Sequence, residues 1–300
     1  MNRCILFLLP LAAILIAGAA EAGPLRALFG GEDDDDGSSA AAEKLDIPGL
    51  TLKKDIAYGI DEKQRIDVYI PPHARHAPVL VMVHGGAWRF GDKTSRGVVG
   101  NKATHWMEEG FIFVSVNNRL LPKADPLAQA DDVRSALAYV QKHAKSWGGD
   151  PQRIILMGHS AGAHLVALLT VDPDYAAAGG VTPWLGTVEL DSAGMDITKL
   201  MSVKHFRFYD AAFTKDPAYW SKASPIDRLK KGAVPMLLIC STRHENSCDQ
   251  AEAFVEKAHS LGVTAEMQQE DMSHMHINTE LGEASPYTEV VDRFIKERLR

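Results

Sequence analysis

The chain has 300 residues, 46% of them hydrophobic, and a formal net charge of −7 at pH 7. A chain of this length and apolar content can bury a large core, in one domain or in two. Much of the negative charge lies in residues 1–43, which hold two basic and seven acidic residues, so that residues 44–300 carry 30 basic and 32 acidic residues. This nearly neutral remainder gives no electrostatic support for a nucleic-acid partner.

Residues 1–22 have the features of a secretory signal. Arg3 supplies a positive start, residues 5–20 form an apolar run, and Ala20-Glu21-Ala22 has the small-x-small form of a cleavage site. We expect export and cleavage, and hence a periplasmic or secreted protein, with an uncleaved anchor as the alternative. The run is short, and nothing later could cross a bilayer, so no stable membrane span is expected after cleavage.

Residues 23–46 are interpreted as an acidic, flexible linker, because four consecutive aspartates precede a stretch of Gly, Ser and Ala. Residues 47–300 are interpreted as one domain. Predicted strands are 52–58, 66–70, 79–83, 111–116, 154–157, 187–190, 236–240 and 264–269. Predicted helices are 102–109, 126–146, 161–171, 248–261 and 287–299. Several strands are continuous apolar runs, which predicts a mostly parallel, doubly wound eight-stranded sheet with helices on both faces.

The segment from about 183 to 229 is less regular and rich in aromatic residues. We expect it to form a small lid or one wall of a pocket, and the alternative is that its rings fill a satellite core.

The pentapeptide Gly158-His159-Ser160-Ala161-Gly162 separates an apolar strand from a helical stretch. Gly-x-Ser-x-Gly in this setting is typical of a nucleophile elbow, where the strained turn and the close helix packing require small residues. Ser160 is therefore the candidate nucleophile. The backbone N–H of Ala161 opens the helix and can face a developing oxyanion.

A second glycine-rich turn, His84-Gly85-Gly86-Ala87-Trp88, follows the strand 79–83. Glycines after a buried strand let backbone N–H groups approach a ligand, so this turn is expected to complete an oxyanion hole with Ala161. Trp88 and His159 are candidate substrate-binding residues.

These two turns, together with Asn117-Asn118-Arg119-Leu120 and Gly148-Gly149-Asp150-Pro151, resemble the α/β-hydrolase superfamily. The resemblance is greatest to the carboxylesterase branch with the His-Gly-Gly-x-Trp motif, which includes kynurenine formamidases and hormone-sensitive-lipase-like esterases. It implies the α/β-hydrolase fold and oxyanion donors at Gly86, Ala87 and Ala161, with Gly85 shaping the turn.

The triad acid is expected after the strand 236–240, because the triad order in this fold is Ser, acid, His. Glu245 and Asp249 compete for the role. Ser247 and Gln250 fit a capping box, which would place Asp249 in the first turn of a helix with a structural task of its own. Glu245 is therefore the preferred acid, and Asp249 is the alternative.

Two cysteines flank this acid. Cys240 and Cys248 are expected to form a disulfide that pins the loop carrying Glu245, and the alternative is two unpaired thiols.

The base is expected after the strand 264–269, where the resemblance selects His274 and leaves His276 as the alternative. The histidines lack carboxylate or Cys partners at ligand spacing, so no metal or other cofactor is expected.

The sequence thus predicts a serine hydrolase that cleaves small carboxylic esters through an acyl-enzyme, with Ser160, His274 and Glu245 as the triad. The alternatives are an arylformamidase-like amide hydrolase, a polysaccharide-ester or feruloyl esterase, and a catalytically silent α/β-hydrolase that binds a partner. The oligomeric state is left open.

Overall fold

The computed structural model describes residue 45 and residues 47–300. The predicted signal sequence, and almost all of the predicted linker, lie outside the described residues. Within the described part of the chain, no helix combines the length and the apolar character that crossing a membrane requires.

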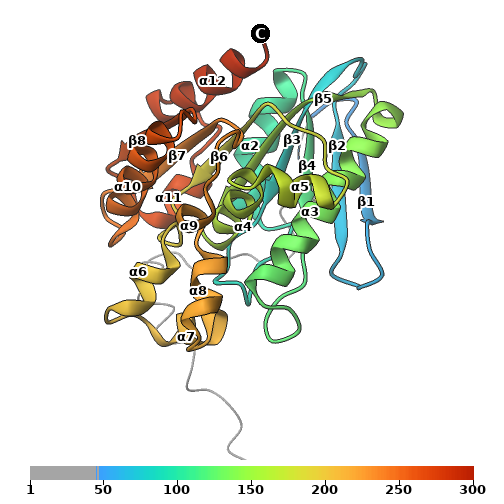
Figure 1. Cartoon of the computed structure of the whole chain (residues 1–300). Coiled ribbons are helices and arrows are strands. Elements are labelled where there is room, and N and C mark those ends of the chain that lie inside the picture. Colours follow the sequence, from blue (N-terminus) through green and yellow to red (C-terminus); the bar gives the residue numbers. More distant parts are fainter. Residues whose placement is uncertain (1–44, 46) are drawn as a thin grey trace, which may run out of the picture.

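Eight strands form one sheet in the order β1-β2-β4-β3-β5-β6-β7-β8 (Figure 1). The strands are β1 (Thr51–Ala57), β2 (Arg65–Ile70), β3 (Ala77–Val83), β4 (Ile112–Val116), β5 (Gly149–His159), β6 (Gly186–Leu190), β7 (Met236–Ser241) and β8 (Ala265–Glu270). β2 pairs antiparallel with β1 and β4, and every pairing from β4 to β8 is parallel. The predicted mostly parallel sheet is confirmed.

Helices cover both faces of the sheet because its strands are apolar on both sides. On β3, Val79 and Val81 belong to the cluster that packs under α3 (Pro126–His143) and α4 (Ala161–Thr170). Leu80 and Met82 alternate with them and pack with the helices on the opposite face. Those helices are α2 (Arg96–Glu108), α11 (His274–Thr279) and α12 (Pro286–Arg298). α10 (Ser247–Ser260) packs on β7 together with the end of α4.

Sequence signals for helix starts explain several of these boundaries. Asp125 caps α3 by accepting a hydrogen bond from the N–H of Ala128 at 2.9 Å, and Pro126 occupies the first turn. Ser285 and Pro286 start α12 in the same way. The helix predicted over 126–146 ends slightly early, with a 3-10 turn, η2 (Ala144–Trp147), completing it.

Short helices occupy most of the irregular segment between β6 and β7. They are α6 (Ile197–Ser202), α7 (Arg207–Phe213), α8 (Pro217–Ala223) and α9 (Pro225–Arg228), and α5 (Pro173–Ala178) precedes β6. α6 to α8 lie beyond the carboxyl ends of the strands, at the lower end of the molecule in Figure 1. This position places them beside the loops that carry the predicted chemistry.

Candidate active site

The nucleophile elbow is built by β5 and α4 in direct succession. Ser160 stands between them with φ 53° and ψ −118°, in the left-handed region that residues other than glycine rarely adopt. A Cβ on Gly162 would lie 2.4 Å from the carbonyl oxygens of Val83 and His84, and a Cβ on Gly158 would lie 2.5 Å from the carbonyl oxygen of Gly162. Both glycines are therefore required by close backbone contacts.

The glycine-rich turn after β3 lies directly against the elbow. A Cβ on Gly85 would lie 3.0 Å from the Cβ of Ser160, and Gly86 adopts φ 120°. Ala87, Ala161 and Ser160 line a common cleft. The two backbone segments predicted to supply oxyanion donors therefore meet beside the serine.

Trp88 lines the same cleft but is almost fully buried. Its indole N–H donates to Nδ1 of His164 at 3.2 Å, and Nε2 of His164 donates to the carbonyl of Ala223 at 2.7 Å. The ring of Trp88 also packs edge-on against Phe213 of α7, with 4.8 Å between centroids. The turn after β3 is thus tied to the short helices of the β6–β7 segment.

His274 starts α11, just after β8, and lines the cleft with Ser160. Its Nδ1 donates to Oδ2 of Asp191 at 2.6 Å. Burial lowers the pKa of His274 more than Asp191 raises it. The imidazole is therefore neutral near pH 7, with the proton on Nδ1 and a basic Nε2. The alternative, His276, is largely exposed, and its Nδ1 lies 3.4 Å from Oε1 of Glu280.

The carboxylate that is hydrogen-bonded to His274 is not the one that the sequence predicted. It belongs to Asp191, the residue directly after β6, whereas the sequence pointed to the loop after β7. Glu245 and Asp249 are both exposed. Asp249 occupies the first turn of α10, as its expected structural role requires. The place in the β7 loop that faces the histidine is taken by His244, whose Nδ1 donates to the same Oδ2 at 2.9 Å.

Asp191 is fully buried and accepts four hydrogen bonds. Burial by itself raises the pKa of Asp191, but the hydrogen bonds from His244 and His274 outweigh it and hold that pKa far below its usual range. The carboxylate is therefore ionised near neutral pH. Its charge can stabilise an imidazolium form of His274.

Sequence reasoning missed Asp191, although one local signal was present. The sequence predicts a strand over residues 187–190, and an Asp that directly follows such a strand lies at the carboxyl edge of the sheet. The adjacent Ser192-Ala193-Gly194 contains the small residues of a tight turn. Asp191 itself adopts φ 54° there.

The structure also corrects the role expected for His159. Its side chain is only 3% exposed and lies outside the cleft lining. Nε2 of His159 donates to the carbonyl of His274 at 3.0 Å, and the two rings lie 4.6 Å apart. His159 therefore holds the backbone of His274 in place from beneath the cleft lining.

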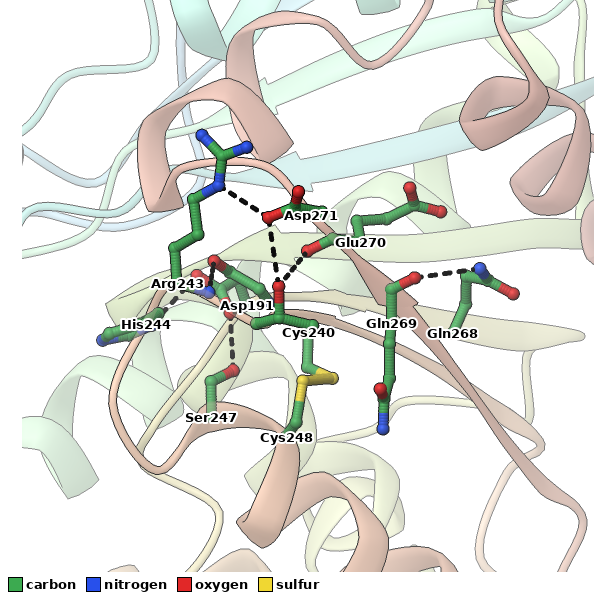
Figure 2. Close-up of a disulfide and its surroundings, with 12 residues drawn as sticks. Asp191, Cys240, Arg243, His244, Ser247, Cys248, Gln268, Gln269, Glu270 and Asp271 are labelled. Atoms are coloured by element: carbon green, nitrogen blue, oxygen red, sulfur yellow. Dashed lines mark hydrogen bonds and ion pairs between the residues drawn. A yellow bond between two sulfur atoms is a disulfide. The ribbon is translucent and has the colours of Figure 1, made fainter.

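Cys240 and Cys248 form a disulfide, with the sulfur atoms 2.08 Å apart and a sequence separation of eight (Figure 2). The loop they enclose carries His244 and Ser247 toward Asp191. The predicted capping box is wrong, because Asn246 occupies the N-cap position without a side-chain cap, and the Ser247 hydroxyl donates to Asp191 Oδ1 at 2.5 Å.

The cleft over Ser160 is closed on one side by aromatic residues of the β6–β7 segment. Phe208 and Tyr209 of α7 line it, with ring centroids 4.1 Å apart. The turn 192–194 and the two histidines form the remaining wall. The segment predicted as a lid or pocket wall thus supplies part of the wall.

Asp191, His244 and His274 are also the group of potential metal ligands found among the described residues, with ligand atoms within 4.8 Å of one another. Nδ1 of each histidine already donates to Asp191. These hydrogen bonds occupy Nδ1 of both histidines, so in this arrangement the two atoms are engaged with the carboxylate of Asp191.

A larger cavity of about 570 Å³ lies at the amino ends of the strands, lined by residues that include Arg75, Arg153 and Lys296. It lies at the opposite edge of the sheet from Ser160. None of its lining residues is a serine or cysteine that could act as a nucleophile.

Comparison with known proteins agrees with this architecture. The family model BD-FAE matches residues 66–257, which is more than half of the chain. The chain belongs to the BD-FAE family. Its fold is that of the α/β-hydrolase superfamily, as the sequence resemblance implied.

The BD-FAE chain is similar to several esterases. Esterase LipQ of Mycobacterium tuberculosis is 30% identical over 201 residues, which cover 62% of this chain and 47% of LipQ. Isoprenylcysteine alpha-carbonyl methylesterase ICME of Arabidopsis thaliana is 27% identical over 235 residues, covering 72% and 54%. The chain thus spans about half the length of these curated relatives.

Solved structures share the fold at lower sequence identity. Esterase 2 of Thermogutta terrifontis superimposes with a TM-score of 0.68 at 21% identity, covering 84% of this chain and 95% of that one. A truncated carbohydrate esterase from gut microbiota gives 0.68 at 18% identity, covering 83% and 97%.

Proposed function

We propose that this protein hydrolyses carboxylic esters, with Ser160 as nucleophile, His274 as general base and Asp191 as the acid that orients it. The observation that carries this proposal is the buried hydrogen bond from His274 to Asp191, beside a serine held on a strained elbow. The three residues follow β5, β6 and β8, so their loops share the carboxyl edge of the sheet. Esterases among the relatives, LipQ and ICME, support the same reaction class.

The geometry supports the following mechanism. Asp191 fixes the His274 proton on Nδ1, so Nε2 accepts the Ser160 proton as the serine oxygen attacks the carbonyl carbon. The backbone N–H groups of Ala87 and Ala161 stabilise the oxyanion. His274 then protonates the departing alcohol, which leaves an acyl group on Ser160, and water activated by the same imidazole releases the acid.

Fluorophosphonate labelling and hydrolysis of a short nitrophenyl ester test this proposal together. We expect the wild type to be labelled and active, and Ser160→Ala to lose labelling together with roughly 10⁴-fold of the esterase rate. The matched control is Ser192→Ala, because Ser192 lines the same cleft but its Oγ accepts a hydrogen bond from the N–H of Gly194 at 3.1 Å. That variant should still be labelled.

Two outcomes would contradict the proposal. A folded wild type that resists the fluorophosphonate would leave a binding role for this fold. Labelling with turnover of N-formylkynurenine, but of no ester in an acyl-chain series, would assign an amide hydrolase in place of an esterase.

A further inference from the structure

The loop between Cys240 and Cys248 donates three hydrogen bonds to the carboxylate of Asp191. The backbone N–H of Ser241 donates to Asp191 Oδ1 at 2.7 Å, and the Ser247 hydroxyl donates to the same oxygen at 2.5 Å. His244 donates from Nδ1 to Oδ2 at 2.9 Å. Three of the four hydrogen bonds that Asp191 accepts therefore come from this loop, and Figure 2 shows Asp191 lying above Ser247 and beside His244.

The segment of Asp191 itself positions the backbone of the residue but not its carboxylate. Asp191 follows the last residue of β6 and adopts φ 54°, a conformation that costs energy for a residue with a side chain. Its backbone N–H bonds to the carbonyl of Ile239 on β7 at 2.8 Å, which places the residue but does not set the rotation of its carboxylate. That rotation decides whether Oδ2 faces His274.

The disulfide holds the two ends of the loop together. Cys240 is the penultimate residue of β7, and Cys248 is the second residue of α10. The bridge therefore joins the end of the strand to the first turn of the helix, and this fixes the distance between Ser241 and Ser247. A crosslink across so short a segment reduces the number of conformations open to the loop that carries both donors.

We propose that this disulfide-closed loop is the cradle of the triad acid, in which His244 and Ser247 are positioning residues that the Cys240–Cys248 bond keeps in place. The proposal rests on the proposed ester hydrolysis at Ser160. The two donors to Oδ1 turn the carboxylate so that Oδ2 faces His274, and His244 holds Oδ2 from the other side. The loop acts on the reaction through Asp191 and His274.

The position of His244 allows a test that separates orientation from mere bulk. Its Nδ1 is the donor to Asp191, and the Nδ2 of an asparagine branches from the same side-chain carbon as that nitrogen does in histidine. His244→Asn should therefore keep the hydrogen bond, whereas His244→Ala removes it. A side chain needed only for packing would not be replaced by the smaller asparagine.

The experiment measures kcat, KM and the rate of fluorophosphonate labelling for His244→Ala, His244→Asn, Ser247→Ala and the double variant Cys240→Ser/Cys248→Ser. Because both side chains act through the orientation of Asp191, we expect kcat to fall about tenfold for His244→Ala and for Ser247→Ala. Ser247 is not among the residues that line the cleft, so KM for Ser247→Ala should stay within about twofold. His244→Asn should recover to within about threefold of the wild type. Loss of the disulfide should lower kcat in the same way.

Arg243→Gln is the matched control in the same loop. The Arg243 side chain is exposed and pairs with Asp271 at 2.7 Å, away from Asp191 (Figure 2). This variant should keep the wild-type kcat. If the double cysteine variant does not fold, kcat is measured instead on the native wild type after mild reduction and alkylation. Mass spectrometry then confirms that both thiols are alkylated.

The outcomes distinguish this proposal from the proposed function. A wild type that is not labelled would remove the esterase proposal, and the cradle with it. An active wild type, with His244→Ala, Ser247→Ala and the reduced protein all at full kcat, would overturn the cradle alone. Equal losses in His244→Ala and His244→Asn, in step with their melting temperatures, would also overturn it, because they would indicate packing.

Discussion

The two halves of the site are built in different ways. The nucleophile half comes from the ends of β3 and β5, where each turn is continuous with its strand. A Cβ added to any of the glycines in these two turns would lie only 2.3 to 3.0 Å from a neighbouring backbone oxygen. The acid half joins side chains that follow β6, β7 and β8, and hydrogen bonds between distant segments hold it together. A continuous backbone turn fixes the position of a serine, whereas an acid needs only a loop that reaches the histidine. The proposed acid, Asp191, can therefore directly follow β6, while Ser160 follows β5 and His274 follows β8.

The largest effect is expected from a substitution in the acid half of the site. Asp191→Asn should lower kcat by roughly 10³- to 10⁴-fold, because an amide offers Nδ1 of His274 no charged acceptor and favours the wrong imidazole tautomer. The measurement is steady-state hydrolysis of a nitrophenyl ester by protein with an unchanged circular dichroism spectrum.

Glu245→Gln is the matched control for Asp191. Glu245 is exposed in the loop after β7, and it is the acid that the sequence predicted. We expect its kcat to stay within about twofold of the wild type, as for most exposed substitutions. A greater loss in Glu245→Gln than in Asp191→Asn would contradict the assignment of the acid to β6.

A smaller effect is expected from one methyl group in the nucleophile half. Gly162→Ala places a Cβ against the backbone carbonyls of Val83 and His84, so the end of β3 must separate from α4. We expect about 1–3 kcal/mol of lost stability, as in overpacked cores, and at least a tenfold lower kcat, because the oxyanion donors at Ala87 and Ala161 would no longer be aligned. Chemical denaturation and ester hydrolysis measure the two quantities.

Gly100→Ala in α2 provides the control for added bulk. A Cβ at that position would meet only the Arg96 side chain, at 3.6 Å. Gly100 stands at a kink in α2, with φ −14° and ψ −105°, so this control is compared by kcat and not by stability. The added methyl should leave kcat unchanged. An equal loss of activity in both glycine variants would show that the close contact at Gly162 is not what aligns the site.

The same contrast explains what could be predicted from the sequence. Strands β3, β5 and β7 contain continuous apolar runs, which predict that helices cover both faces of the sheet. Ser160 lies in a motif whose glycines specify the turn. The acid could not be found in this way, because an Asp after a strand becomes a triad member only when a histidine from another strand faces it. Ser247 illustrates the same limit. Its sequence context indicates a helix cap, but the buried charge of Asp191 provides a stronger acceptor for its hydroxyl.

The smallest expected effect is a shift in the pH profile of kcat/KM. This profile depends on both halves of the site, because His274 of the acid half accepts the proton of Ser160. Only the neutral form of His274 can accept the Ser160 proton, so kcat/KM falls as the pH decreases through the pKa of His274. Burial lowers that pKa below the ordinary value of 6.5, although Asp191 opposes the change. The acidic limb for a neutral ester, followed from about pH 4.5 to 8, should therefore have its midpoint below 6.5.

Asp191→Asn sharpens the pH measurement. Removing the negative charge removes the contribution that raises the pKa of His274, so the residual activity of this variant should show its acidic limb at a still lower pH than the wild type. Asp191 itself remains ionised over this range, because its hydrogen bonds hold its pKa far below the usual value. A limb that moved to higher pH in the variant would contradict the pairing of Asp191 with His274. The titrating group would then have to be sought elsewhere in the cleft.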